Sequence, residues 1–301
     1  ISACLVGSEM CIRDRARSLV FWSMDLNPDE AIAAGWLHAD SKIARLLSGM
    51  LLHSLRRADI IVALDRFMKE RIRAKGIAAE KVLVVPPWAH DDCVRFDPGG
   101  REEFRAHHKL SDKFVVMYSG NHSPCHPLET LLEAAERLLE NANLVFCFVG
   151  GGSEFSKIKE RARNRGLHNV LCLPYQPIEK LSGSLSAADL HVVVMGDPYV
   201  GIVHPCKIYN VLAVKKRFLY IGPSESHVTD IIGESDAFIS PHGDVKGVMK
   251  NILRAMEKGA IELQLGSSME SLFSKDRLVP AMIGVIEQAD CRARSRVTQG
   301  A

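Results

Sequence analysis

Short apolar runs that alternate with helical segments fill the chain from Lys113 to Lys258, and they constrain its fold more than any other feature. The runs are Phe114–Ser119, Leu144–Val149, Val170–Leu173, Leu190–Met195, Phe218–Ile221 and Phe238–Ser240. They do not alternate apolar with polar residues, so they indicate strands that are buried on both faces of a parallel sheet. The sequence therefore predicts an α/β protein whose residues 113–262 form a doubly wound, Rossmann-like domain.

A shorter version of the same pattern precedes this domain. Its predicted strands and helices are Leu19–Met24, Lys42–Arg57, Ile60–Leu64, Phe67–Lys75 and Val82–Val85. Three strands are too few for a complete domain of this type. We therefore predict that residues 16–97 are the C-terminal part of an incomplete N-terminal Rossmann-like domain. A linker over 98–112 and a C-terminal helix with a basic tail over 263–301 complete the predicted organisation.

The first residues have a different character. Cys4–Arg15 resembles one reading frame of the transposase adapter used to prepare sequencing libraries, with Met10–Asp14 as the translated mosaic end. A genuine leader peptide is the alternative, although the stretch lacks the charged region and apolar run of a secretory signal. We predict that residues 1–15 are an adapter-derived artefact and that the gene was cut at its 5′ side.

Charge and cysteine usage exclude several classes of protein. The 301 residues carry 38 basic and 36 acidic side chains, a balance that argues against a dedicated nucleic-acid binder. None of the eight cysteines has CxxC spacing, so neither a zinc site nor a redox dithiol is indicated. No apolar run approaches the ~20 residues that span a bilayer. We expect a cytoplasmic protein, with contact at the inner face of the cytoplasmic membrane as a further option.

Four loops that follow predicted strands carry the candidate site residues. They are Gly120–His126, Gly150–Gly152, Pro174–Pro177 and Gly196–Lys207. In an open parallel sheet, ligands bind at the carboxyl ends of the strands. Glycine lets the backbone approach a ligand, and a helix N-terminus attracts phosphate. Lys207 begins a predicted helix, where the dipole disfavours a cation unless an anion is bound beside it. The alternatives are ordinary turns, a rigid corner and a solvated lysine.

Two features of the first half point to contacts of other kinds. Asp25 follows a predicted strand, where it would face a cleft between domains, or would instead make a local turn or helix cap. Residues 41–75 are rich in Lys and Arg and carry an apolar stripe. This segment could dock on an anionic membrane, or it could be a core-facing helix with a solvated basic face.

Taken in order, these segments resemble the family 4 glycosyltransferases of the GT-B fold, and above all the branch that builds bacterial capsule, O-antigen and colanic-acid-type polysaccharides. The resemblance covers Ala16 to about Ala289. The residues that carry it are Met24–Pro28, Ala58–Asp65, Val84–Trp88, Met117–Asn121, Leu128–Ala134, Phe148–Gly152, Leu173–Pro177, Ala188–His191 and His204–Tyr209.

The resemblance implies two Rossmann-like domains, of which the C-terminal one holds a nucleotide-diphosphate sugar and the N-terminal one a glycan or lipid-linked acceptor. It also implies transfer with retention of anomeric configuration and no bound metal or cofactor. Asp25 would face the sugar, and Lys207 would neutralise the phosphates. The other donor-binding residues by position are Gly120, Asn121, His126, Gly151, Gly152, Tyr175, Gln176, Pro205 and Asn210.

The chain departs from the family pattern at one motif. Many members have two glutamates eight positions apart, and the matching positions here are Ile202 and Asn210. Asn210 can still hydrogen-bond a ribose hydroxyl, whereas Ile202 cannot bind a sugar hydroxyl in that way. The resemblance as a whole still predicts a retaining glycosyltransferase in the full-length parent. The alternatives are a nucleotide-binding module or an inactive fragment without catalysis and, third, a sugar-nucleotide epimerase.

Overall fold

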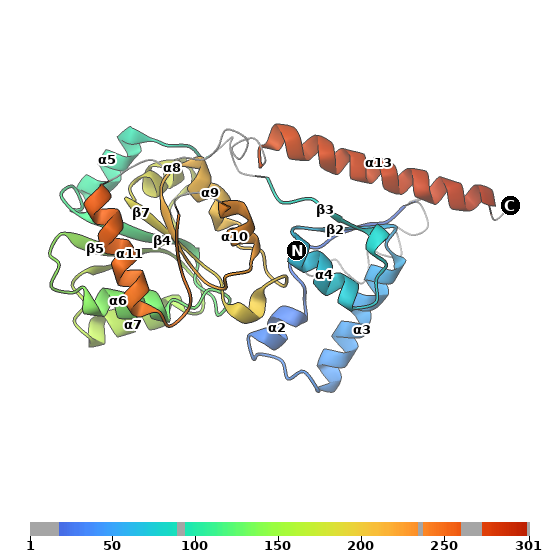
Figure 1. Ribbon diagram of the computed structural model, residues 1–301, viewed down its shortest axis with the longest axis horizontal. Helices are drawn as coiled ribbons and strands as arrows, with labels where there is room; N and C mark the ends of the chain where they lie inside the picture. The colour runs from blue at the N-terminus through green and yellow to red at the C-terminus, as the bar shows by residue number, and fades with distance from the viewer. Residues whose placement is uncertain (1–17, 89–93, 234–236, 260–272, 300–301) are drawn as a thin grey trace. The chain divides into compact units, whose positions relative to one another are not determined.

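The computed structural model describes residues 18–88, 94–233, 237–259 and 273–299 (Figure 1). The predicted adapter-derived stretch, residues 4–15, lies outside these ranges. The chain divides into two compact units, of which the first contains the residues up to Pro86 and those from Asp276 onward. The second unit is Pro87–Lys275. The C-terminal helix, predicted as a separate segment, is thus grouped with the first unit.

The first unit contains a three-stranded parallel sheet in the order β1-β2-β3. Its elements are β1 (Val20–Trp22), α2 (Asp29–Ala33), α3 (Lys42–Arg57), β2 (Ile60–Ala63), α4 (Arg66–Ala74), the 3₁₀ turn η2 (Ala79–Lys81), β3 (Val82–Val84) and α13 (Lys275–Gln299). Side-chain caps fix two helix starts: Ser41 Oγ accepts from the Ala44 amide at 3.0 Å, and Asp65 Oδ1 accepts from Met68 at 2.8 Å. The central strand β2 is buried along its whole length.

The second unit contains a six-stranded, all-parallel sheet in the order β6-β5-β4-β7-β8-β9. Its elements are α5 (Pro98–His107), β4 (Phe114–Asn121), α6 (Glu129–Arg137), β5 (Leu144–Gly151), α7 (Phe155–Asn164), β6 (Val170–Leu173), α8 (Ile178–Ser186), β7 (Leu190–Val194), the 3₁₀ turn η3 (Asp197–Tyr199), α9 (Lys207–Ala213), β8 (Phe218–Ile221), α10 (His227–Ile232), β9 (Phe238–Ser240) and α11 (Val245–Lys258). This is the doubly wound order, and its direction reverses between β4 and β7. The predicted strands are confirmed.

Alternate residues of the strands enter two different cores. Val116 and Tyr118 of β4 pack with α6 and α11 on one face, whereas Val115 and Met117 pack with α5 on the other. Helices therefore cover both faces, which is why the strands have no polar side. Within the described residues, no helix is both long and apolar enough to cross a bilayer.

Helix α5 occupies most of the segment for which the sequence predicts a linker, residues 98–112. Asp97 Oδ1 accepts from the Gly100 amide at 2.9 Å, and Pro98 stands in the first turn, so the segment begins as a capped helix. Phe104 is buried against the sheet. Pro-Gly-Gly suggests a loop when taken alone, but the cap and this apolar contact favour a helix.

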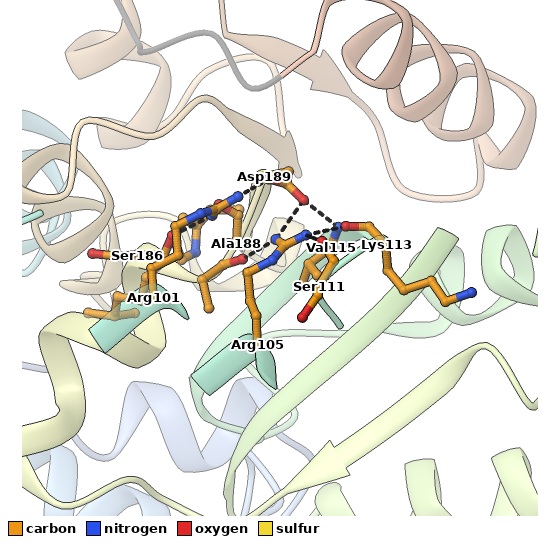
Figure 2. Close-up of polar contacts among 11 residues, drawn as sticks. Arg101, Arg105, Ser111, Lys113, Val115, Ser186, Ala188 and Asp189 are labelled. Atoms are coloured by element: carbon orange, nitrogen blue, oxygen red, sulfur yellow. Dashed lines mark hydrogen bonds and ion pairs between the residues drawn. The ribbon is translucent and has the colours of Figure 1, made fainter. Parts of the chain in front are cut away.

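A buried carboxylate holds α5 to the sheet (Figure 2). Asp189, the residue before β7, accepts from Arg101 Nη2 at 2.6 Å, from Arg105 Nη1 at 3.0 Å and from the Val115 amide at 2.8 Å. Arg105 also donates to the carbonyl of Ala187 at 2.8 Å. The network therefore joins α5 to the first residues of β4 and β7.

Candidate functional site

The loops after β4 and β7 meet at the point where the strand order reverses. The Gly196 amide donates to the Cys125 carbonyl at 2.9 Å, and His126 Nδ1 donates to the Val194 carbonyl at 2.9 Å. In doubly wound sheets this is where ligands bind. The fold therefore places the Gly120–His126 loop beside the loop that leads to Lys207.

Two glycines bring the ends of β4 and β5 close together. Gly120 and Gly150 pair across the strands with φ values of 133° and 135°, a region that residues with a side chain rarely adopt. A Cβ at Gly150 would collide with the Gly120 carbonyl, and a Cβ at Gly120 would lie 2.6 Å from Lys207 Cε. The absence of a side chain at Gly120 therefore lets Lys207 extend across the end of β4, and its absence at Gly150 lets β5 lie against the Gly120 carbonyl.

Lys207, the first residue of α9, reaches the end of β4. Its Nζ donates to the Tyr118 hydroxyl and to the Asn121 carbonyl, the latter at 2.9 Å. It also lies 4.1 Å from the centroid of the Tyr118 ring. The Tyr118 hydroxyl donates to the same Asn121 carbonyl at 2.7 Å. Lys207 forms no ion pair with a carboxylate in the part of the chain that the structure describes, so the site offers a basic group without a counter-charge.

Burial dominates the electrostatics of this site. It lowers the pKa of Lys207 well below its ordinary value and raises that of Tyr118 well above its own. Burial, followed by the proximity of Lys207, lowers the pKa of His122 to about 4 and that of His126 well below its ordinary range. Both imidazoles are therefore neutral near pH 7.

His122 ties the two glycine-containing loops together, a role that the sequence did not indicate. Its amide donates to the Gly151 carbonyl at 2.7 Å, and its Nδ1 donates to the same oxygen at 3.3 Å. Its ring lies 4.7 Å from the Phe155 ring and 4.8 Å from the Tyr118 ring. A local signal existed, since His122 stands inside the Gly120–His126 loop, but its partners are distant in sequence.

Tyr175 and Gln176 face different surroundings. The Tyr175 ring packs on the Gly150–Gly151 backbone, where a Cβ at Gly151 would lie 3.0 Å from the ring, and the side chain is 58% exposed. Gln176 Nε2 donates to the Pro174 carbonyl at 3.0 Å. Gln176 also lines a cavity of about 350 Å³ between α5 and α8. Tyr175 therefore borders the glycine turns, and Gln176 borders a neighbouring cavity.

The remaining candidate donor-binding residues, Gly152, Pro205 and Asn210, differ in how far they are buried. A Cβ at Gly152 would collide with Asn121 Oδ1 and the His122 carbonyl. Pro205 is buried just before α9, and Asn210 is half-buried, one helical turn after Lys207. The matching position of the other family glutamate, Ile202, is a core residue, 3% exposed.

The second unit thus brings most of the predicted donor residues into one place. Those that meet at the ends of β4 and β5 are Gly120, Asn121, Gly151, Gly152, Tyr175 and Lys207. Asp25 belongs to the first unit, where it is exposed in the bend that follows β1. Its predicted role toward the sugar stays a prediction.

Residues 100–203 match the family model described as Glycosyl transferases group 1. The match spans α5 to the loop after β7, and so includes Gly120, Asn121 and the Gly150–Gly152 turn. It ends shortly before Lys207. The family match and the candidate donor-binding loops therefore lie in the same unit, the second one.

Two curated relatives carry similar names. The chain is 32% identical over 177 residues to "Putative colanic acid biosynthesis glycosyl transferase WcaI" of Escherichia coli strain K12, with 58% of this chain and 43% of the relative covered. It is 24% identical over 211 residues to "Probable glycosyltransferase WbjE" of Pseudomonas aeruginosa, with 70% and 52% covered. The chain therefore spans about half the length of the curated relatives that it matches.

A solved structure shares the fold. The crystal structure of Anabaena Alr3699/HepE in complex with UDP and glucose superposes with a TM-score of 0.74 at 15% identity, covering 95% of this chain and 76% of that one. The predicted fold class, a GT-B-like α/β protein built from Rossmann-like parallel sheets, is confirmed.

Proposed function

We propose that the second unit binds a nucleoside-diphosphate sugar, and that the protein transfers this sugar, with retention of configuration, to a glycan or lipid-linked acceptor. The observation that supports this most is Lys207, a basic group that extends over Gly120 at the switch point of the sheet and has no carboxylate partner in the described chain. The Glycosyl transferases group 1 match supports the same chemistry. So does the solved relative, which holds UDP and glucose.

In this proposal, negative charge develops on the diphosphate as the bond to the anomeric carbon breaks. Fixed positive groups aimed at that charge lower the barrier. Lys207, the backbone at Gly120 and the N-terminus of α6 would supply them. The exposed Tyr175 ring would border the base, and Asn210 the ribose. Asp25, from the first unit, would face the sugar.

Nucleotide binding tests the proposal first. We expect calorimetry of this chain to show binding of UDP or of GDP, and binding of neither would overturn the proposal. Transfer is then assayed in the same chain with sugar nucleotides and lipid-linked acceptors. Binding without transfer there would favour the alternative of a nucleotide-binding module. Interconversion of the donor sugar without an acceptor would favour an epimerase.

We expect transfer to proceed without a metal ion. The loops after the strands of the second unit contain no DxD-type acidic pair that could hold Mg²⁺ against the diphosphate. The transfer rate should therefore be the same after exhaustive dialysis against EDTA as in added Mg²⁺ or Mn²⁺. A rate that collapses in EDTA and returns with either ion would contradict this expectation.

The acceptor side is proposed to work at an anionic membrane, through the outer face of α3. This helix carries Lys42, Arg45, Arg56 and Arg57 and no acidic residue. Its core-facing positions, Ala44 and Leu55, are buried. A second apolar stripe is exposed instead; its members are Ile43, Leu46, Leu47 and Met50, at 62%, 65%, 39% and 47%. An exposed apolar stripe flanked by basic residues matches the chemistry of an anionic lipid surface, and the protein would then act at the inner face of the cytoplasmic membrane.

Replacing Leu46 by glutamate should weaken binding to vesicles that contain phosphatidylglycerol by about tenfold or more, because burial of one leucine contributes roughly 1.5–3 kcal/mol. Co-sedimentation measures the effect. Ile283→Glu is the matched control, since Ile283 is an exposed apolar residue of α13 in the same unit. Equal loss in both variants, or no loss in either, would exclude α3 as the docking face.

A further inference from the structure

The order of the strand ends in the second unit matches the order of the parts of a nucleotide sugar. The sheet runs β6-β5-β4-β7. Tyr175 follows β6, and Lys207 reaches the end of β4. A nucleoside-diphosphate sugar joins base, ribose, diphosphate and sugar in one line. With the base at Tyr175 and the diphosphate at Lys207, the sugar lies toward the end of β7, three strand spacings or about 14 Å from β6.

The loop that begins at the end of β7 is Gly196 followed by Asp197. The Gly196 amide donates to the Cys125 carbonyl at 2.9 Å. A Cβ at Gly196 would lie 3.2 Å from Pro127 Cδ, so the chain passes close to the segment that leads into α6. These contacts place Asp197, the first residue of η3, beside the Gly120–His126 loop.

Buried residues hold η3 in place. The amide of Tyr199 donates to the Gly196 carbonyl at 3.0 Å, and the amide of Ile202 donates to the Tyr199 carbonyl at 2.9 Å. Tyr199 is 5% exposed and Ile202 is 3% exposed, whereas Asp197 is exposed. The turn is therefore anchored from below and presents one carboxylate to solvent.

The Asp197 carboxylate has open acceptor positions. Among the residues that the structure describes, none donates a hydrogen bond to it or forms an ion pair with it. Burial, together with the negative charge of Asp197 nearby, raises the pKa of Tyr220 to about 12. The Tyr220 hydroxyl donates to Ser226 Oγ at 2.9 Å, so its proton is used elsewhere. A carboxylate accepts hydrogen bonds on both oxygens and donates none, which suits the hydroxyl groups of a sugar.

We propose that Asp197 accepts hydrogen bonds from the hydroxyl groups of the donor sugar, and that it selects a neutral hexose over a uronic acid. This inference rests on the proposed function, because it concerns the sugar of the same donor. A hydroxyl that donates to a carboxylate makes a strong, charge-assisted hydrogen bond. A carboxylate on the sugar would instead meet a like charge, which weakens binding.

Calorimetry of this chain with two matched pairs of sugar nucleotides tests the proposal. The pairs are UDP-glucose with UDP-glucuronate, and GDP-mannose with GDP-mannuronate. The members of a pair differ only in a hydroxymethyl group that is replaced by a carboxylate. For the base that the chain binds, we expect the neutral member to bind at least about tenfold more tightly than the acidic one.

Replacing Asp197 by alanine should change the two members of a pair in different ways. The Kd of the neutral sugar nucleotide should rise about ten- to hundredfold. The Kd of the acidic one should stay the same or fall, because the like charge is gone. Asp197→Asn keeps one acceptor oxygen without the charge, so it should lose less affinity for the neutral member. UDP or GDP alone should bind both variants no more weakly than the wild-type chain, which shows that the nucleotide site is intact.

Glu225→Ala is the matched control. Glu225 is an exposed carboxylate in the loop after β8, one strand beyond β7. This variant removes the same charge from the same edge of the sheet, and it should leave the ratio of the two Kd values unchanged. Equal shifts in Asp197→Ala and Glu225→Ala would assign the selection to net charge and overturn the inference.

The outcomes for the two proposals are distinct. If neither UDP nor GDP binds to the wild-type chain, the proposed function fails. If one of them binds but the chain does not prefer the neutral member of the pair, or binds neither member, the nucleotide site stands and the role of Asp197 is wrong. The same holds if Asp197→Ala weakens both members equally or changes neither.

Discussion

Replacing Asp189 by alanine will lower the free energy of unfolding of the second unit by about 3–5 kcal/mol, the range for removing one partner of a buried ion pair. The substitution leaves the guanidinium groups of Arg101 and Arg105 without their carboxylate and the Val115 amide without its acceptor. Urea titration with hydrogen exchange of peptides from β4 and β7 measures the effect where it should arise.

A matched control lies on α5, the helix that carries Arg101 and Arg105. Glu103 forms an ion pair with Lys180 at 3.0 Å, with side chains that are 69% and 61% exposed. Exposed pairs contribute only about 0–1 kcal/mol, so Glu103→Ala should change the free energy of unfolding little. Equal effects of Asp189→Ala and Glu103→Ala would show that α5 is held by its apolar contacts alone.

Replacing Lys207 by alanine will weaken the binding of a nucleoside diphosphate by about 1.5–3 kcal/mol, the range for a hydrogen bond to a charged group. This corresponds to roughly a 10- to 150-fold rise in Kd. The variant removes the basic side chain that crosses Gly120, whereas it leaves the Tyr118–Asn121 hydrogen bond in place. Calorimetry with UDP and GDP measures the change.

Lys180→Ala serves as the control for general loss of positive charge, because Lys180 lies on the exposed side of α8. Its effect on Kd should stay within a factor of about two, since exposed charges are screened by salt. An unchanged Kd in Lys207→Ala would remove this residue from the anion site and with it the main support for the proposed function.

Local sequence patterns predicted the strands well because burial on both faces leaves a plain signal, a continuous apolar run. They could not give the strand order, since pairing of β4 with β7 depends on residues far apart in the chain. Helix α5 was missed for a related reason. The residue that holds it, Asp189, is 84 residues from Arg105, so a window around Pro-Gly-Gly contains no sign of it.

In the candidate site, too, some residues could be recognised from the local sequence and others could not. Gly120 and Lys207 could be chosen from residue type and position, because glycine lets the backbone approach a ligand and a lysine at a helix start implies a nearby anion. His122 could not be singled out, since its carbonyl partner Gly151 is 29 residues away. Ile202 is a core residue. The apolar side chain at this family glutamate position therefore contributes to packing.

The close fit between the two turns restricts where this protein can diversify. Asn121 and His122 leave no room for a side chain at Gly152, and the Gly120 carbonyl leaves none at Gly150. A substitution in either turn would therefore force the other to move, and the two would have to change together. Tyr175 is exposed, and its ring packs on the Gly150–Gly151 backbone. In the proposed function Tyr175 borders the base, so a preference for a different base would evolve at this exposed ring while the two glycine turns beneath it stay unchanged.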